Sequence, residues 1–378
     1  LHSDTHSFPT RRSSDLVVFQ FCITTVLIIS TIVIYRQLNH LNKTDLGYEK
    51  ESIVYFPLLG DHAKESVEVL KNELKAFPFV YAAGATSAMP GWNFTRNGYF
   101  PEGYEEPVMI NVLDVDEDFL ETMDIEIAKG EGFSDASSLD DDQYLVNQAF
   151  VKEFGWKEPI GKEIERNGKH KVIGVVKDFY FAPLYIEVLP LIITNEPWQG
   201  FEYLALRMNM NDLQNSLSKI EEKWKSLVPG EPFVYEFMDN WIKKVYQRER
   251  NFGKLFLYFS ILAILIACLG LLGLAAFMVE QRTREIGIRK VFGASSGNVV
   301  RLLSWDFSKL VIISNVIAWP VAWYIMQNWL ERFAIRIPLS LWIFLFAGLL
   351  AFVLAFITVS YQSLRAANTN PAEVVKYE

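Results

Sequence analysis

Acidic side chains alternate along one short stretch, and this spacing can build a calcium site. Asp114, Asp116 and Asp118 form a D-x-D-x-D pattern. A calcium loop of this kind has glycine at its sixth position for a sharp turn, whereas this sequence has Phe119. We therefore predict that Asp116 caps a short helix over residues 116–123. The five histidines show no metal-ligand spacing, so no metal site is predicted.

Two glycine–lysine pairs lie in a turn-like, charged stretch. Gly161-Lys162 and Gly168-Lys169 lack the GxxxxGK[ST] spacing of a nucleotide-binding phosphate loop, which occurs nowhere in the sequence. No Ser-His-Asp group or metal cluster emerges that would indicate catalysis. We therefore expect a non-catalytic chain without catalytic residues or a cofactor of its own.

The most distinctive polar chemistry lies in a basic stretch, QRTREIGIRKVFGAS at residues 281–295, which directly follows an apolar segment. If residues 283–292 are helical, Ile288, Val291 and Phe292 form one apolar patch. Such a helix can seat in a groove on a partner protein, or it can lie on an anionic lipid surface, and the residues by themselves fit both. The residues of this candidate contact are Glu285, Ile288, Arg289, Lys290, Val291, Phe292 and Gly293.

Apolar residues gather in segments long enough to cross a membrane. The segments are residues 16–35, 255–279, 308–330 and 341–361. Since a helix rises about 1.5 Å per residue, each spans roughly the 30 Å hydrocarbon core of a bilayer. Hydrophobic residues make up 51% of the chain and charged residues 21%, which excludes a disordered chain. We predict a membrane protein with four transmembrane α-helices and a large extracytoplasmic α/β (α+β) domain.

Loop charge predicts the orientation. The loop after the second span carries an excess of arginine and lysine, so it is expected in the cytoplasm. Four spans then place both chain ends in the cytoplasm, residues 36–254 and the short loop 331–340 outside, and the tail 362–378 inside. The net charge of −9 argues against nucleic acid as a partner.

The long region between the first two spans has the patterning of a globular domain. Strands are predicted over residues 52–58, 80–88, 108–113, 144–147, 171–177, 189–194, 203–208 and 233–237. Amphipathic helices are predicted over residues 63–77, 148–154 and 211–228, the last with an apolar stripe through Leu217, Ile220 and Trp224. Residues 239–254 are predicted as a polar stalk helix that runs into the second span without a break.

The first fifteen residues differ from the rest. LHSDTHSFPTRRSSD has no apolar periodicity and does not begin with Met. It resembles a translated sequencing adapter, so residues 1–15 are interpreted as an artefact and are excluded from the fold prediction.

Several motifs together carry a family resemblance. EIGIRKVFGAS at residues 285–295, the tail NPAEVVKYE at 370–378, VDEDFLETMDIEIAKGEGF at 115–133, YLVNQAFVKEFGW at 144–156 and KVIGVVKDFYFAPL at 171–184 are typical of one group. With them, the chain resembles the FtsX-like, MacB-type ABC transporter permeases, and in particular the C-terminal half of a Bacteroidetes-like tandem permease. The resemblance implies an FtsX-like permease domain over residues 255–371 and a MacB-type periplasmic core domain over residues 36–254.

The resemblance also implies a role and partners. Such permeases sit in the inner (cytoplasmic) membrane, pair with a separate ABC ATPase that binds the ATP, and work as homodimers or with a second permease half. Residues 280–307 would then be the cytoplasmic coupling segment, contacting the ATPase rather than lipid alone. The expected task is export or extraction of an amphiphilic substrate such as a peptide, antibiotic or lipoprotein, with a periplasmic adaptor as a possible further partner. A regulatory role over an extracytoplasmic enzyme or an antimicrobial-peptide response is the alternative.

The coupling segment can be tested by substitution. We expect Phe292→Ala and Val291→Asp to abolish ATPase binding, because buried apolar anchors typically contribute roughly 2 kcal/mol or more each to an interface. Arg289→Ala, at the rim, should have a smaller and salt-dependent effect. The measurement is co-purification of the ATPase with each variant in detergent at low and high salt. Full ATPase binding by Val291→Asp would show that this segment is a lipid-surface helix.

Overall fold

The computed structural model describes residues 8–91, 94–134, 143–197, 200–281 and 296–367. The chain forms two compact units. Unit 1 contains the long apolar helices, and unit 2 comprises residues 43–247 together with residues 333–335. Each unit is described by itself.

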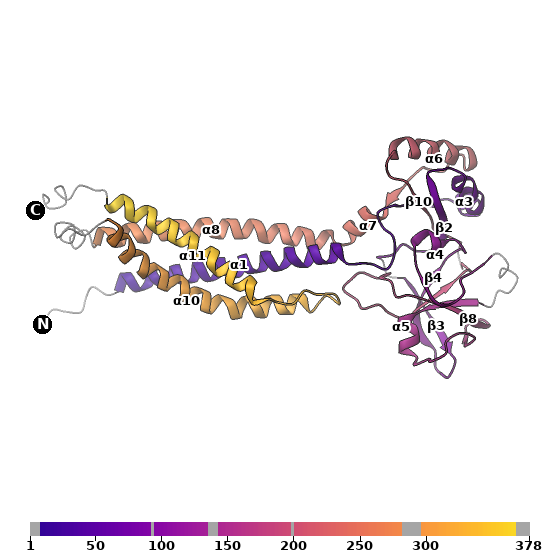
Figure 1. Ribbon diagram of the computed structural model, residues 1–378, viewed down its shortest axis with the longest axis horizontal. Coiled ribbons are helices and arrows are strands. Elements are labelled where there is room, and N and C mark those ends of the chain that lie inside the picture. Colours follow the sequence, from indigo (N-terminus) through magenta and orange to yellow (C-terminus); the bar gives the residue numbers. More distant parts are fainter. Residues whose placement is uncertain (1–7, 92–93, 135–142, 198–199, 282–295, 368–378) are drawn as a thin grey trace, which may run out of the picture. The chain divides into compact units, whose positions relative to one another are not determined.

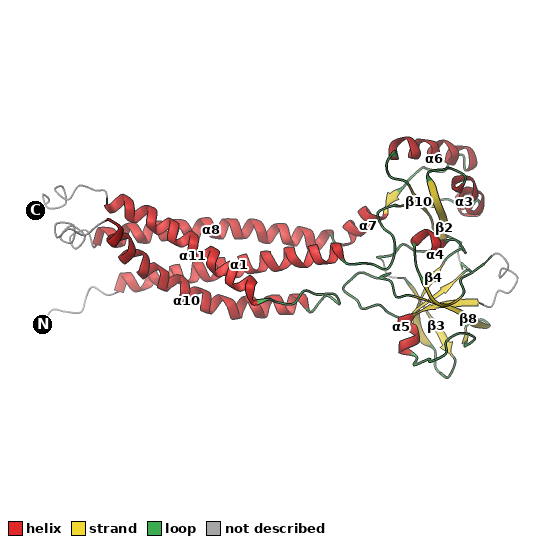
Figure 2. Ribbon diagram, viewed as in Figure 1, coloured by secondary structure: helices red, strands yellow, loops and turns green. Residues whose placement is uncertain are grey.

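Unit 1 is built from long helices (Figure 2). They are α1 (Phe8–Lys43), α8 (Gln247–Gln281), α10 (Ser296–Leu330) and α11 (Leu341–Ala367). Each contains an apolar stretch long enough to cross a membrane, which confirms the four predicted spans. Helix α1 begins at Phe8 and therefore includes part of the stretch that was excluded from the sequence-based fold prediction.

Polar side chains of α1 bond to neighbouring helices of unit 1. The Thr25 hydroxyl donates to Asn315 Oδ1 of α10 at 3.1 Å, and the hydroxyls of Thr31 and Ser260 of α8 share a hydrogen bond of 2.8 Å. Thr25 is fully buried. A bilayer offers no water to such groups, so they must find partners inside the bundle. These bonds link α1 to both α8 and α10.

Unit 2 contains a four-stranded antiparallel sheet whose strand order is β11-β1-β10-β2. Its strands are β1 (Ile53–Pro57), β2 (Val80–Thr86), β10 (Tyr203–Met208) and β11 (Glu236–Phe237). Helices α3 (Val67–Lys75) and α6 (Leu213–Leu227) share one core with this sheet (Figure 1). The predicted stripe of α6 is confirmed, because Leu217, Ile220 and Trp224 are buried there. Helix α4 (Phe119–Met123) contacts β2 and β10.

A seven-stranded mixed sheet forms the rest of unit 2, in the order β5-β8-β6-β9-β4-β3-β7. Its strands are β3 (Thr95–Pro101), β4 (Val108–Asp114), β5 (Ile127–Gly130), β6 (Gln143–Asn147), β7 (Glu163–Glu165), β8 (Lys169–Val176) and β9 (Leu191–Thr194). The pairs β4–β9 and β6–β8 are parallel. Helix α5 (Gln148–Glu153) packs Phe150 into the core on one face of this sheet.

The predicted strands are confirmed, with ends that differ by a few residues. The sequence patterns did not indicate β3, β5 or β7, because β3 is largely polar, all four residues of β5 are exposed, and β7 has only three residues. The single helix predicted over residues 63–77 is wrong. The structure has α2 (Asp61–Glu65) and then α3, separated at Ser66, whose ψ of 8° leaves the helical region.

The alternating aspartates have a different role from the predicted helix cap. Helix α4 begins after Asp118, and neither Asp116 nor Asp118 caps it with a side-chain hydrogen bond. Instead, Lys71 Nζ of α3 lies 3.0 Å from Asp116 Oδ2 and 3.3 Å from Asp118 Oδ2. It also contacts Glu117 at 2.8 Å and Glu68 at 3.0 Å. The capping prediction is therefore wrong, since Asp116 pairs with a lysine 45 residues away in sequence.

Burial governs the charge of this cluster. The side chains of Lys71 and Asp116 are each 2% exposed. Burial raises the pKa of Asp116 to about 7, because the Lys71 ammonium only partly offsets the lost hydration. Burial alone would lower the pKa of Lys71, but hydrogen bonds to Glu117 and Asp116 raise it overall. Asp116 therefore contributes most to stability below its unfolded pKa of 3.8, and this contribution is lost as pH rises through 7.

Substitution of Lys71 tests how much this cluster contributes to the free energy of unfolding. We expect Lys71→Met to lower the free energy of unfolding by about 3 kcal/mol, because it leaves the buried Asp116 without its counter-ion. The double variant Lys71→Met/Asp116→Leu should recover at least half of the loss. The measurement is thermal unfolding of the full chain in detergent, followed by tryptophan fluorescence. Equal stability of Lys71→Met and the unsubstituted chain would show that the cluster contributes nothing.

Candidate functional site

The predicted coupling residues lie outside the described part of the chain. Glu285, Ile288, Arg289, Lys290, Val291, Phe292 and Gly293 fall between Gln281, where α8 ends, and Ser296, where α10 begins. The coupling assignment therefore stays a prediction. The structure does describe how α8 and α10, on either side of these residues, pack against their neighbours.

Both helices that border the coupling segment belong to one packed core of unit 1. Leu271 of α8, Phe307 of α10 and Ala355 of α11 are buried in the same cluster as Phe21 of α1. The C-terminal end of α8 and the N-terminal end of α10 lie at the same end of the bundle (Figure 1). A shared core resists sliding of one helix past another, because interiors are close-packed. The parts of α8 and α10 around Leu271 and Phe307 are therefore held in one core.

At its other end, α8 follows directly on α7 (Met238–Val245), which is anchored inside unit 2. Trp241 Nε1 of α7 donates a 2.8 Å hydrogen bond to the carbonyl oxygen of Pro90. The next residue, Gly91, has φ of +96°, and a Cβ there would lie 3.2 Å from Val245 of α7. Glycine thus permits both the turn and the close approach of α7.

A buried tyrosine completes this contact. The Tyr246 hydroxyl accepts a 2.9 Å hydrogen bond from the backbone N–H of Leu184, and its ring packs against Tyr185 at 5.9 Å. Tyr246 is 5% exposed. We call Pro90, Gly91, Leu184, Trp241 and Tyr246 the stalk junction. Burial raises the pKa of Tyr48 well above its ordinary value, and Tyr55 and Tyr246 contribute to the shift.

The unbroken stalk helix predicted over residues 239–254 is wrong. The helix is interrupted at Tyr246, whose φ and ψ of −99° and 15° separate α7 from α8. The physical reason is the stalk junction, where the Tyr246 side chain is held by Leu184 and Tyr185 in unit 2 while the following residues continue into unit 1. The interruption coincides with the boundary between the units, after Gln247.

A second chain segment reaches the aromatic side of the stalk junction. Residues 333–335, in the connection between α10 and α11, belong to unit 2. Phe333 is 4% exposed, and its ring lies 5.2 Å from that of Tyr185. Tyr185 therefore contacts both Tyr246 and Phe333, which are far apart in sequence.

Comparison with known protein families decides the identity of the chain. The model for the FtsX-like permease C-terminal domain matches residues 257–371, and the model for the MacB-like periplasmic core domain matches residues 21–208. The chain is an FtsX-like, MacB-type ABC transporter permease. Permeases of this family are membrane proteins that work with an ABC ATPase partner. No curated protein matches the sequence.

Several solved structures are similar to part of the permease. The periplasmic region of MacB from Actinobacillus actinomycetemcomitans is 13% identical, with a TM-score of 0.39, 53% of this chain covered and 94% of that one. The extracellular domain of the noncanonic ABC-type transporter YknZ from Gram-positive bacteria is 15% identical, with a TM-score of 0.36 and coverage of 49% and 97%. A domain of a putative permease protein from Porphyromonas gingivalis is 16% identical, with a TM-score of 0.36 and coverage of 49% and 88%.

The sequence patterns did not single out the stalk junction of the permease. Trp241 and Tyr246 lie in a segment that is otherwise rich in charge, and an aromatic residue in such a segment is a weak signal of a buried contact. Their partners, Pro90 and Leu184, are distant in sequence, so only the folded chain brings them together.

Removing one hydroxyl from the stalk junction should loosen α7. We expect Tyr246→Phe to leave the Leu184 N–H without a partner in a buried position, at a cost of about 1–3 kcal/mol. Amide hydrogen exchange in residues 181–186 and 238–246 should speed up, while β4 and β9 stay protected. The measurement is hydrogen exchange by mass spectrometry on the full permease in detergent. Tyr235→Phe is the matched control, because Tyr235 is 39% exposed and makes ring contacts. Unchanged exchange in Tyr246→Phe would contradict an anchoring role.

Proposed function

We propose that the permease relays ATP-driven motion of a separate ABC ATPase to its outer domain, for export or extraction of an amphiphilic substrate such as a peptide, antibiotic or lipoprotein. In this proposal the ATPase docks on the predicted coupling residues 285–293 in the cytoplasm, and unit 2 lies outside the cytoplasmic membrane. The excess of arginine and lysine after α8 supports this orientation, with both chain ends inside.

The observation that carries the proposal is the continuity of α8. This helix runs for 35 residues from Gln247, beside the stalk junction, to Gln281, beside the predicted coupling segment. At 1.5 Å per residue it is about 52 Å long. A helix of that length, hydrogen-bonded throughout and packed against its neighbours, moves as a rod. Displacement of one end is then transmitted to the other.

The stalk junction supports the same role. A helix transmits motion to a domain only if its end is fixed to that domain. Helix α7, directly before α8, is fixed in unit 2 by the hydrogen bonds of Trp241 and Tyr246. The chain also passes between the units after Asn42 and around residues 333–335. The chain therefore crosses between the units at four points: after Asn42, after Gln247 and on each side of residues 333–335. Tyr185 contacts both Tyr246 and Phe333, which lie beside three of these crossings.

The relay can be interrupted without touching the ATPase contact. We compare two insertions of equal length after Gln247: Gly-Ser-Gly-Ser, which is flexible, and Ala-Ala-Ala-Ala, which prolongs the helix by about 6 Å. In the unsubstituted complex, a non-hydrolysable ATP analogue should change hydrogen exchange in residues 238–246 relative to ADP. We expect the flexible insertion to reduce this change by at least half, and the alanine insertion to keep most of it.

The measurement is hydrogen exchange by mass spectrometry on the permease–ATPase complex in nanodiscs. ATPase co-purification checks that both insertions leave docking intact. An equal nucleotide response in both insertions, with the ATPase bound, would contradict a relay through α8.

A further inference from the structure

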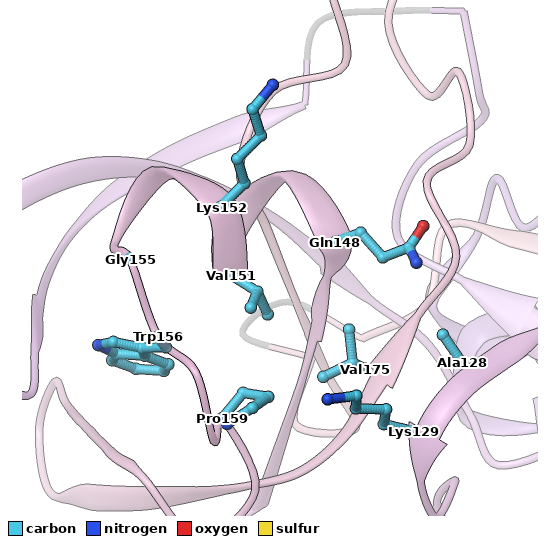
Figure 3. Close-up of a pocket in the computed structure, with 9 residues that line it drawn as sticks. All are labelled: Ala128, Lys129, Gln148, Val151, Lys152, Gly155, Trp156, Pro159 and Val175. Carbon is cyan, nitrogen blue, oxygen red and sulfur yellow. The ribbon is translucent and has the colours of Figure 1, made fainter.

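A groove of about 430 Å³ lies in unit 2, and it shares no lining residue with the stalk junction (Figure 3). It is lined by Ala128, Lys129, Gln148, Val151, Lys152, Gly155, Trp156, Pro159 and Val175. This volume falls in the range of pockets that hold small organic molecules, and the lining combines an apolar floor with few polar groups, as such pockets do. Nothing in the relay described above uses it.

One wall of the groove is set by the way α5 ends. The N–H of Trp156 donates to the carbonyl oxygen of Val151 at 3.1 Å, and the N–H of Gly155 to that of Lys152 at 3.3 Å. With Gly155 at φ of +64°, this pair of bonds is a Schellman motif, in which glycine takes the left-handed position. The motif places the Trp156 ring beside Val151, so both side chains face the groove.

The floor exists because α5 is short. Its six residues cover only part of the sheet, and Val175 of β8 remains at the base of the groove with Pro159. The far wall is β5, the edge strand, whose residues are all exposed. The start of α5 is fixed by the buried Asn147, whose Oδ1 accepts from Phe150 N–H at 3.0 Å. The groove is therefore built on fixed elements.

The charge of the groove is positive, although the whole chain carries −9. No carboxylate is among the lining residues. The Lys129 ammonium lies between Val175 and Pro159 in Figure 3, whereas Lys152 extends away from the cavity. Lys129 makes no ion pair with any described residue. Gln148 Oε1 accepts from the Asp178 N–H at 3.4 Å, which leaves its amide nitrogen as a donor.

We propose that this groove binds a small amphiphile that carries a carboxylate. The Lys129 ammonium and the Gln148 amide nitrogen hold the carboxylate, since hydrogen bonds to a charged group are the stronger ones. Trp156, Pro159 and Val175 take the apolar body of the ligand, which leaves water on binding. The interpretation of this ligand as cargo rests on the proposed export function, whereas the binding itself does not.

The test uses the full chain in phosphatidylcholine nanodiscs without ATPase, so that a failure here is separate from a failure of the relay. The probe is 4-phenylbutyrate, observed by saturation-transfer NMR, with empty nanodiscs subtracted. The matched neutral and cationic probes are 4-phenylbutanol and 4-phenylbutylamine. We expect the carboxylate to bind at least tenfold more tightly than the amine, and the alcohol to fall between them.

Three variants locate the binding. Lys129→Glu should weaken 4-phenylbutyrate at least tenfold, and Ala128→Phe, a change at an exposed position that fills the groove, should abolish binding of all three probes. Lys171→Glu is the matched control, because Lys171 is an exposed lysine of β8 outside the lining. Unfolding temperatures check that the variants fold. Any of three results would overturn the proposal. The first is unchanged 4-phenylbutyrate binding in Lys129→Glu or Ala128→Phe, and the second is equal binding of the three probes. The third is a loss of binding in Lys171→Glu as large as that in Lys129→Glu.

Discussion

The lack of water inside a bilayer is the constraint on which the arrangement of this permease depends. A backbone N–H or C=O without a partner costs several kcal/mol in hydrocarbon, so each membrane-crossing segment must be a continuous helix. This requirement accounts for the apolar part of α8, since about 20 residues of a helix cross the hydrocarbon core, and that part lies within one helix of 35 residues. The same requirement pairs Thr25 with Asn315 and Thr31 with Ser260, which ties α1 to its neighbours. The stiffness of the helices, which the proposed relay needs, thus follows from the lack of water in the bilayer.

The interruption of the helix lies beside the boundary between the units, where contacts within unit 2 hold the chain. At Tyr246 the helix stops for one residue, and the side chain gains a hydrogen bond from Leu184 and a ring contact with Tyr185. The stalk junction is held by neutral groups, whose contacts do not weaken with salt as surface ion pairs do. The Lys71 cluster is different, because its strength depends on the balance of one ammonium against four carboxylates.

The two sheets of unit 2 differ in how completely they are covered. The four-stranded sheet has α3 and α6 in one shared core, with α4 contacting β2 and β10 as well, so β1 and β2 are almost wholly buried. Gly84 of β2 allows this, because a Cβ there would lie 2.5 Å from the Phe119 Cα of α4. The seven-stranded sheet has the short α5 on one face, and the part of that face near β5 stays open. The groove arises where this covering helix ends early.

The sequence by itself determined the four spans, most strands, the apolar face of α6 and the family, because these depend on local periodicity and short motifs. It also identified a candidate coupling segment at residues 285–293, although it could not show what that segment contacts. Only the tertiary structure decided the partners of Lys71, the interruption at Tyr246 and the groove beside Lys129. Each of these joins residues separated by tens of positions, such as Lys71 with Asp116, Tyr246 with Leu184, and Lys129 with Val175. Burial and hydrogen-bond geometry between such residues arise only when the chain has folded, so no local pattern encodes them.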